Sequence, residues 1–331
     1  MPKISVILPY FNAEKTLKRS VISILEQSFS DFELLLVNNN STDNSYKIAK
    51  KLAKNDSRII LFQEQKQGVV FATQKGLKKT NSAFIARADA DDFWHKEKLL
   101  LQYNFLKENP KIDVVSCRVN FIGDAKNDGM LTYVEETNKL LTHKQIELSR
   151  FSELQVINPT IMFRKKVALE HGLYKDGDFP EDYEMFLRWI EKGVKYHKLP
   201  EYLLDWYDSE TRLTRTDKRY SFEAFYKVKS SYLFNYLKEN NPHFPNIVVW
   251  GAGKRTKKRT KTIKNLGVKI SYFIDVSEKK INGNDVISYK HIPPKGQIFI
   301  VSFVNNKGIR QKIKDFLISK QYIEGHNFII A

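Results

Sequence analysis

The chain has 331 residues, which is long enough for two domains that each have a core of their own. Hydrophobic residues make up 42% of it and aromatic residues 13%, which excludes an intrinsically disordered protein. Its single cysteine excludes an intrachain disulfide and suits a reducing compartment, and the absence of an 18-residue apolar run predicts no transmembrane helix. We therefore expect a cytoplasmic protein.

The formal net charge of +17 is unevenly distributed along the chain. Residues 246–331 hold 17 Lys or Arg against 5 Asp or Glu, a net of +12, whereas the first 245 residues carry only +5. An anionic partner is therefore expected at the C-terminal part of the chain.

The first sixty residues alternate between strand and helix patterns. Lys3–Pro9, Phe32–Val37 and Ile59–Phe62 are apolar runs of strand length, and Glu14–Gln27 carries a helical apolar stripe. A second helical pattern precedes the third run. This alternation predicts a parallel sheet with right-handed crossovers, in which the loops after the strands open at one edge.

An acidic motif follows the next buried strand, Ala83–Ala86. Asp89, Asp91 and Asp92 lie within four residues and are followed by a helical pattern from Lys98. Carboxylates this close repel one another unless a cation lies among them, and hard oxygen ligands favour Mg²⁺ or Mn²⁺. The alternative is a helix cap beside a solvated turn. The position at the carboxyl end of a strand favours the metal site.

Polar loops follow the first two strands as well. Pro9 is followed by Tyr10-Phe11-Asn12, and the second strand ends in Asn38-Asn39-Asn40-Ser41-Thr42-Asp43. Taken alone, the second loop is typical of an Asx turn before a helix. Gly68 precedes a further helix, where it serves either a close backbone approach to a ligand or only a turn. Between Gly123 and Lys139 we expect a loop or a short hairpin.

A second pair of acids, Glu181 and Asp182, begins an amphipathic helix that extends to about Ile190. Acids at this position complement the helix dipole, which alone explains them. The dipole is also expected to keep Asp182 ionised.

Together these motifs resemble those of the inverting nucleotide-sugar glycosyltransferases with the GT-A fold, the large family two. The sequence Arg87-x-Asp89-Ala90-Asp91-Asp92 is similar to a common form of the family's Asp-x-Asp motif. Two departures stand out: Phe11 occupies the tyrosine position of the first loop, and Asn38 and Asn39 replace two aspartates of the nucleotide-base loop.

The resemblance implies a role for each motif. Asp89, Asp91 and Asp92 would hold Mn²⁺ or Mg²⁺, and Asp182, preceded by Glu181, would be the general base that deprotonates the acceptor hydroxyl. Because an asparagine oxygen still accepts a hydrogen bond from uracil, uridine remains the expected base. The residues implied in donor binding are Pro9, Phe11, Asn12, Asn38, Asn39, Gly68, Arg87, Asp89 and Ala90.

The implied reaction is transfer of a sugar from a nucleoside-diphosphate sugar to a hydroxyl of a glycan or a polyprenyl-diphosphate-linked glycan in surface polysaccharide synthesis. Two rivals stay open. A nucleotidyltransferase normally has a Gly-rich, basic loop after its first strand, which is missing here. A non-catalytic scaffold protein is favoured if the two asparagines signal lost donor binding.

The remaining chain predicts a linker and a second domain. We expect a GT-A domain at 1–225, a helical linker at 226–245 and a small Rossmann-like α/β domain at 246–331. Gly251 and Gly253 follow a strand and Asp275 ends the next, as in dinucleotide-binding folds, but Thr256 replaces the third glycine. We therefore favour a structural or docking role over NAD binding.

Seven Lys or Arg residues lie between positions 254 and 264. A solvated helix face is the ordinary fate of such a run, but each base near an anionic leaflet contributes about 1 kcal/mol of attraction. We expect peripheral contact with the inner membrane face. Nucleic acid is not expected, because no recognised binding motif accompanies the basic run.

Overall fold

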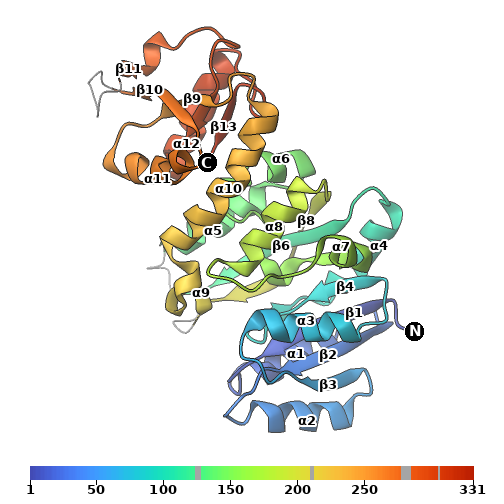
Figure 1. The fold of residues 1–331 in the computed structure, drawn as a ribbon. Coiled ribbons are helices and arrows are strands. Elements are labelled where there is room, and N and C mark those ends of the chain that lie inside the picture. The colour runs from blue at the N-terminus through green and yellow to red at the C-terminus, as the bar shows by residue number, and fades with distance from the viewer. Residues whose placement is uncertain (124–127, 209–211, 277–284, 305) are drawn as a thin grey trace. The chain divides into compact units, whose positions relative to one another are not determined.

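The computed structural model describes residues 1–123, 128–208, 212–276, 285–304 and 306–331 (Figure 1). The chain divides into two compact units. The first comprises residues 1–146 and 155–217, and the second comprises residues 147–154 and 218–331. Among the described residues, no helix combines the length and the apolar character that crossing a bilayer requires.

The first unit is built on a mostly parallel sheet with the order β3-β2-β1-β4-β7-β6-β8-β5. Strands β1 (Ile4–Tyr10), β2 (Phe32–Asn38), β3 (Ile59–Gln63) and β4 (Phe84–Arg87) run parallel to one another. Every residue of β1 and β2 is buried, because helices cover both faces of this part of the sheet. The parallel arrangement predicted for the first strands is confirmed.

The other half of the sheet is mixed. Strand β7 (Met162–Arg164) is antiparallel to both β4 and β6 (Val114–Ile122), whereas β6 is parallel to β8 (Tyr196–Tyr207). The short β5 (Phe93–Trp94) pairs antiparallel with β8. This last pairing brings the end of β8 beside the segment that follows the acidic motif.

The helices of the first unit pack on the sheet through apolar faces. Val6 and Leu8 of β1 share a core with Val21 and Ile24 of α1, whereas Ile7 points to the opposite face. The helices are α1 (Leu17–Leu25), α2 (Ser45–Asn55), α3 (Val69–Lys79), α4 (Lys98–Glu108), α5 (Asp128–Lys139), α7 (Lys165–His171), α8 (Glu181–Glu191) and α9 (Leu213–Thr216), and α6 (His143–Leu148) lies at the boundary of the two units.

Helix α5 corrects the loop or hairpin predicted between Gly123 and Lys139. The described part of that stretch is a helix from Asp128 to Lys139, and residues 124–127 lie outside the described residues. Val134 is buried, and the Asn138 side chain both donates to the Val119 carbonyl and accepts from the Val119 amide of β6. Packing on β6 therefore helps to stabilise this helix.

The second unit contains a parallel sheet with the order β11-β10-β9-β12-β13. Its strands are β9 (Asn246–Trp250), β10 (Lys269–Asp275), β11 (Val286–Ser288), β12 (Ile300–Ser302) and β13 (Phe328–Ile330). Its helices are α10 (Phe222–Asn240), α11 (Lys254–Asn265) and α12 (Lys307–Ser319). Because α10 is one continuous helix in this unit, it spans the boundary that the sequence suggests at residue 225.

The glycine turn of the second unit is closed by an acid. The Asp275 carboxylate at the end of β10 accepts a hydrogen bond of 2.7 Å from the Ala252 amide. Gly251 has a φ of +103°, which favours glycine, and a Cβ there would lie 3.0 Å from the Thr256 hydroxyl.

Of the seven basic residues in this region, Lys254, Arg255, Lys258, Lys261 and Lys264 are exposed, whereas Arg259 is buried.

Candidate active site

The acidic motif lies at the carboxyl end of β4, in the centre of the first sheet. The backbone is held on both sides there: the Ala88 amide donates to the Ile7 carbonyl over 3.0 Å, and the Arg87 amide donates to the Ile161 carbonyl over 3.1 Å. Asp89 is thus the second residue beyond a strand whose position is fixed by two neighbouring segments. This is the edge at which ligands bind in open α/β sheets.

Helix α1 fixes the turn that follows. The Ser20 hydroxyl donates to the Asp89 carbonyl over 2.7 Å, and the Arg19 guanidinium donates to the Asp91 carbonyl. The same guanidinium lies 3.6 Å from the ring centroid of Tyr207 at the end of β8. Because side chains of α1 bind the backbone of the turn, the three carboxylates of the turn stay close together.

Asp89, Asp91 and Asp92 each present a carboxylate oxygen within 4.8 Å of the others. Burial, followed by repulsion from Asp89, raises the pKa of Asp91, and Arg212 and Arg19 oppose this rise. Burial and the repulsion of Asp91 and Asp89 raise the pKa of Asp92 well above its ordinary value. Three acids held together in this way favour a cation among them.

Asp92 provides a direct test of the metal prediction. Its side chain is fully buried, and Oδ1 accepts a hydrogen bond of 3.3 Å from the Tyr207 amide. Its Oδ2 is buried and has no hydrogen-bond partner among the described residues. A buried carboxylate oxygen without a donor is costly, and a hard divalent cation removes that cost. The donor set therefore fits Mn²⁺ or Mg²⁺.

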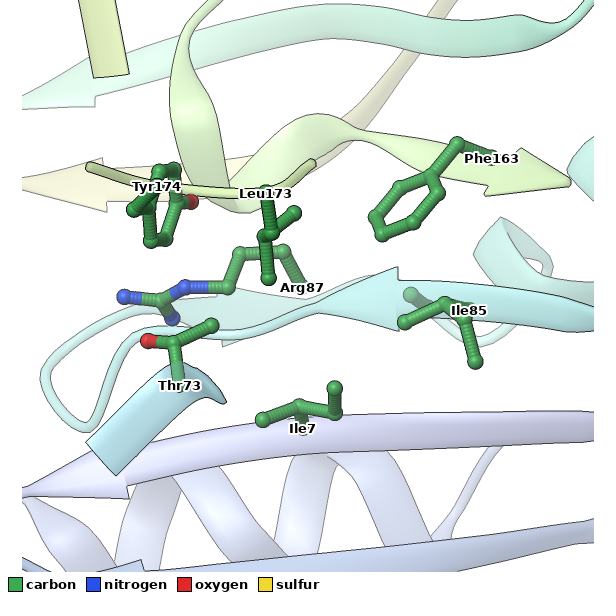
Figure 2. A pocket seen from close by; sticks show the side chains of 8 residues that line it. Ile7, Thr73, Ile85, Arg87, Phe163, Leu173 and Tyr174 are labelled. Carbon is green, nitrogen blue, oxygen red and sulfur yellow. The ribbon is translucent and has the colours of Figure 1, made fainter. Parts of the chain in front are cut away.

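Arg87 pairs with the first acid of the motif. Its guanidinium lies 2.8 Å from Asp89 Oδ1, and its side chain is almost fully buried. Figure 2 shows the guanidinium between Thr73 and Tyr174, in a narrow pocket that is otherwise mainly apolar. The Tyr174 hydroxyl donates to Asn158 over 2.6 Å. The buried guanidinium of Arg87 thus orients the carboxylate of Asp89.

Asp182 is the second residue of α8, which begins directly after Pro180. Burial, followed by the charges of Glu181 and Asp89, raises its pKa to about 7. The expectation that the helix dipole keeps Asp182 ionised is therefore wrong, because burial and two neighbouring carboxylates outweigh the dipole. The influence of Asp89 also indicates that α8 and the acidic turn face one site. Glu181 is itself buried.

The asparagine-rich loop after β2 is tied to both of its neighbours. Asn39 donates to the carbonyls of Glu64 and Lys66 over 3.2 and 2.8 Å, and its Oδ1 accepts from the Gly68 amide over 2.8 Å. Asn38 Oδ1 accepts from the Ser41 amide over 3.1 Å. Both asparagines are buried, so they support the loop as well as any ligand beside it.

The first loop interlocks with the second. Asn12, with a φ of +47°, accepts from the Thr42 amide over 2.9 Å, and its own amide donates to the Ser41 hydroxyl over 3.1 Å. The Phe11 ring is about half exposed, whereas Pro9 is buried and Ala90 is half-buried. The residue that follows the exposed Phe11 is thus bonded to the loop that carries the two asparagines.

Sequence reasoning missed four residues of this site: Arg19, Tyr174, Tyr207 and Arg212. Arg212 donates to the Tyr207 carbonyl, lies 3.9 Å from the Trp206 ring centroid and lowers the pKa of both Asp91 and Asp92. These residues come from segments far from the acidic motif in sequence. Only their positions next to strand ends or on the first helix could have suggested them.

Comparison with known sequences decides the family. The sequence model described as "Glycosyl transferase family 2" matches residues 5–173, which is just over half of the 331 residues. The chain belongs to this family. The match includes the nucleotide loops and the acidic motif but ends before Asp182. The expectation of a glycosyltransferase is therefore confirmed, and the role of Asp182 stays a prediction.

Two related proteins are named for O-antigen and for teichuronic acid biosynthesis. The chain is 28% identical over 244 residues to the O-antigen biosynthesis glycosyltransferase WbnJ of Escherichia coli, covering 71% of this chain and 89% of WbnJ. It is 30% identical over 191 residues to the putative teichuronic acid biosynthesis glycosyltransferase TuaG of Bacillus subtilis, covering 53% of this chain and 73% of TuaG.

A shorter match joins the chain to a protein whose name states a substrate. It is 37% identical over 107 residues to the UDP-Glc:alpha-D-GlcNAc-diphosphoundecaprenol beta-1,3-glucosyltransferase WfgD of Escherichia coli, covering 32% of this chain and 42% of WfgD.

Solved structures confirm the GT-A fold. TarS of S. aureus (residues 1–349) in complex with UDP-GlcNAc has a TM-score of 0.55 and 21% identity, covering 71% of this chain and 66% of TarS. The mannosyltransferase PcManGT of Pyrobaculum calidifontis, in complex with GDP-Man and Mn²⁺, has a TM-score of 0.50 and 16% identity, covering 72% of this chain and 64% of PcManGT. The chain thus spans about two thirds of the length of these structures.

Proposed function

We propose that the protein is a metal-dependent, inverting glycosyltransferase that moves a sugar from a UDP-sugar to a hydroxyl of a glycan or polyprenyl-diphosphate-linked acceptor. The observation that carries the proposal is the convergence of Asp89, Asp91 and Asp92 at the carboxyl end of β4, with the carboxylate of Asp182 within electrostatic reach. Inverting transfer needs this combination of a site for the donor diphosphate and a separate base for the acceptor.

The carboxylates of Asp89 and Asp91 are partly exposed and would hold Mn²⁺ or Mg²⁺ with Asp92 behind them. When bound, the cation stabilises negative charge on the leaving nucleoside diphosphate. Arg87 keeps Asp89 in position through the 2.8 Å ion pair. Arg212 lies where its positive charge offsets the acidic cluster, and it would also attract the diphosphate.

Asp182 would accept the proton of the acceptor hydroxyl while the hydroxyl oxygen attacks the sugar carbon. A positioned base typically contributes about 10²–10⁴-fold in rate, and it works best with a pKa near the working pH. The pKa of Asp182, raised to about 7 by burial and by Glu181 and Asp89, meets that condition.

Asn38 and Asn39 would line the base pocket beside Phe11. Each asparagine oxygen accepts one hydrogen bond from the protein backbone and keeps a second acceptor site for an imide N–H. The UDP-sugar bound by TarS and the UDP-glucose named for WfgD support uridine as the base. Asn12, Pro9, Gly68 and Ala90 would complete the donor site through backbone contacts.

The lipid-linked acceptor named for WfgD also supports a location at the cytoplasmic face of a membrane. Five exposed bases of α11 (Lys254, Arg255, Lys258, Lys261 and Lys264) would supply the contact. Each contributes about 1 kcal/mol near an anionic leaflet, although Lys258 already pairs with Glu223 at 2.5 Å. Binding to anionic but not to neutral vesicles at physiological salt tests this contact, and equal binding to both would exclude it.

A thermal-shift experiment tests the donor site. UDP with Mn²⁺ is expected to raise the melting temperature, and UDP with EDTA is not, because the diphosphate contacts the protein largely through the cation. Asp91→Asn should abolish the response without unfolding the protein. Stabilisation by UDP that is indifferent to Mn²⁺ would contradict the metal site, and indifference to every nucleotide would favour a scaffold. Release of UDP from a set of UDP-sugars then identifies the donor.

A further inference from the structure

The second unit contains a buried cluster of positive charge that sugar transfer does not use. Lys229 of α10, Arg259 of α11 and Arg310 of α12 approach one aromatic side chain, Tyr226. The Lys229 ammonium lies 3.9 Å from the ring centroid of Tyr226, and the Arg259 guanidinium lies 5.3 Å from it. Arg310 acts electrostatically on Tyr226 and on both other cations.

The charges of this cluster are not balanced. Lys229 and Arg259 are each 4% exposed, and the Arg310 side chain is 12% exposed. The carboxylate recorded beside them is that of Glu153, 3.7 Å from Arg310. Burial, followed by the charges of Arg259 and Arg310, lowers the pKa of Lys229 to about 7, and Glu153 opposes this shift only in part. When Lys229 is protonated, three cations face one acid among the described residues, in a site with little exposure to water.

The donors of the cluster are also incompletely used. Arg259 donates through Nη1 to the Phe303 carbonyl, but its buried Nε has no acceptor among the described residues. The Lys229 ammonium contacts the ring of Tyr226. It makes no hydrogen bond and no ion pair with the residues that the structure describes. Buried donors and buried charge without partners are costly, and an anion would remove both costs together.

The cluster is placed where the second sheet changes direction. In the order β11-β10-β9-β12-β13, the connections from the neighbouring strands β9 and β12 lead to opposite edges of the sheet. Phe303 directly follows β12, and Arg310 is in the first turns of α12. Arg259 thus joins α11 to the carboxyl end of β12, next to the point at which open α/β sheets bind ligands.

We propose that Lys229, Arg259 and Arg310 form a binding site for the phosphate group of a small soluble molecule, separate from the sugar-transfer site. Guanidinium groups bind phosphate oxygens through paired N–H donors, and an ammonium adds a point charge. The small exposure of Lys229 and Arg259 favours a free phosphate over a lipid headgroup held in a membrane surface.

Titration of the full chain with inorganic phosphate tests the proposal. The buffer contains EDTA and chloride at constant ionic strength, so that neither the metal site nor general screening contributes. Phosphate should raise the melting temperature of the wild type. Lys229→Met keeps the length of the side chain and removes a buried charge, so it should melt at or above the wild-type temperature without phosphate and bind phosphate at least about tenfold more weakly.

Lys227→Met is the matched control, because Lys227 is exposed on the same helix. This variant should keep the full phosphate response. The proposal is overturned if phosphate does not stabilise the wild type, if Lys229→Met responds as the wild type does, if both variants lose the response equally, or if phosphatidic acid vesicles bind while free phosphate does not. UDP with Mn²⁺ should stabilise both variants as it does the wild type. If UDP with Mn²⁺ fails to stabilise even the wild type, the proposed sugar-transfer site is contradicted, but the phosphate site is not.

Discussion

Replacement of Asp182 by asparagine tests the proposed base most directly. Asparagine keeps the shape of the side chain and can still accept the 2.7 Å hydrogen bond from the Tyr183 amide, but it cannot take a proton from the acceptor. We expect kcat for transfer to fall by about 10²–10⁴-fold. Stabilisation by UDP with Mn²⁺ should remain, because the donor is bound by other residues.

The pKa of Asp182 fixes the pH dependence. With a pKa of about 7, the carboxylate is deprotonated in about a tenth of the molecules at pH 6 and in about nine tenths at pH 8. The rate of the wild type should therefore rise with pH along an acid limb with a midpoint at or below 7, since a bound cation favours the ionised form. The residual rate of Asp182→Asn should lack this limb.

Stability should change in the opposite sense. Because the unfolded state loses this proton near pH 4 and the folded state only near pH 7, the raised pKa destabilises the folded state progressively between these pH values and in full above pH 7. The rise from 3.8 to about 7 corresponds to at most about 4 kcal/mol. In EDTA at pH 8, Asp182→Asn should thus unfold at equal or higher urea concentration than the wild type. A transfer rate within a few-fold of the wild type, with an unchanged pH profile, would refute the reasoning.

Two further substitutions probe how the first unit supports the site. A Cβ at Gly76 of α3 would lie 2.5 Å from Ile7, so Gly76→Ala should lower the free energy of unfolding by about 1–3 kcal/mol in urea, whereas Gly129→Ala in open space should be neutral or slightly stabilising. Equal effects would contradict the close packing. Arg87→Met removes the partner of Asp89; because that carboxylate is 33% exposed, we expect a loss of about 2 kcal/mol together with weaker stabilisation by UDP and Mn²⁺. Unchanged melting and unchanged UDP binding would exclude the positioning role.

Local sequence was sufficient for the parallel half of the first sheet. The strands from β1 to β4 are short apolar runs bounded by polar loops, and burial on both faces makes such runs continuous. The order of chain segments then places Asp89 and Asn38 at one sheet edge. Helix α5 was not recognised, and the two hydrogen bonds of Asn138 to Val119 that hold it on β6 are contacts that the local sequence does not show.

The residues that support the acidic turn could not be predicted from the sequence either, because their contacts depend on the folded arrangement. Arg19 and Arg212 act through backbone carbonyls and aromatic faces, which carry no sequence signature. The ionisation of Asp182 depends on Glu181 next to it and on Asp89, which is distant in sequence. A helix start indicates a dipole, but only the folded arrangement shows how many negative charges share the same space.

The side-chain amide of Asn39 restricts which residues this loop can carry at position 39. An aspartate at this position would face the carbonyls of Glu64 and Lys66 without a proton to offer either. The asparagine is therefore matched to the 64–68 segment, because two carbonyls of that segment accept its two N–H groups. Asn39→Asp alone should loosen that segment, so a change at either place requires a change at the other.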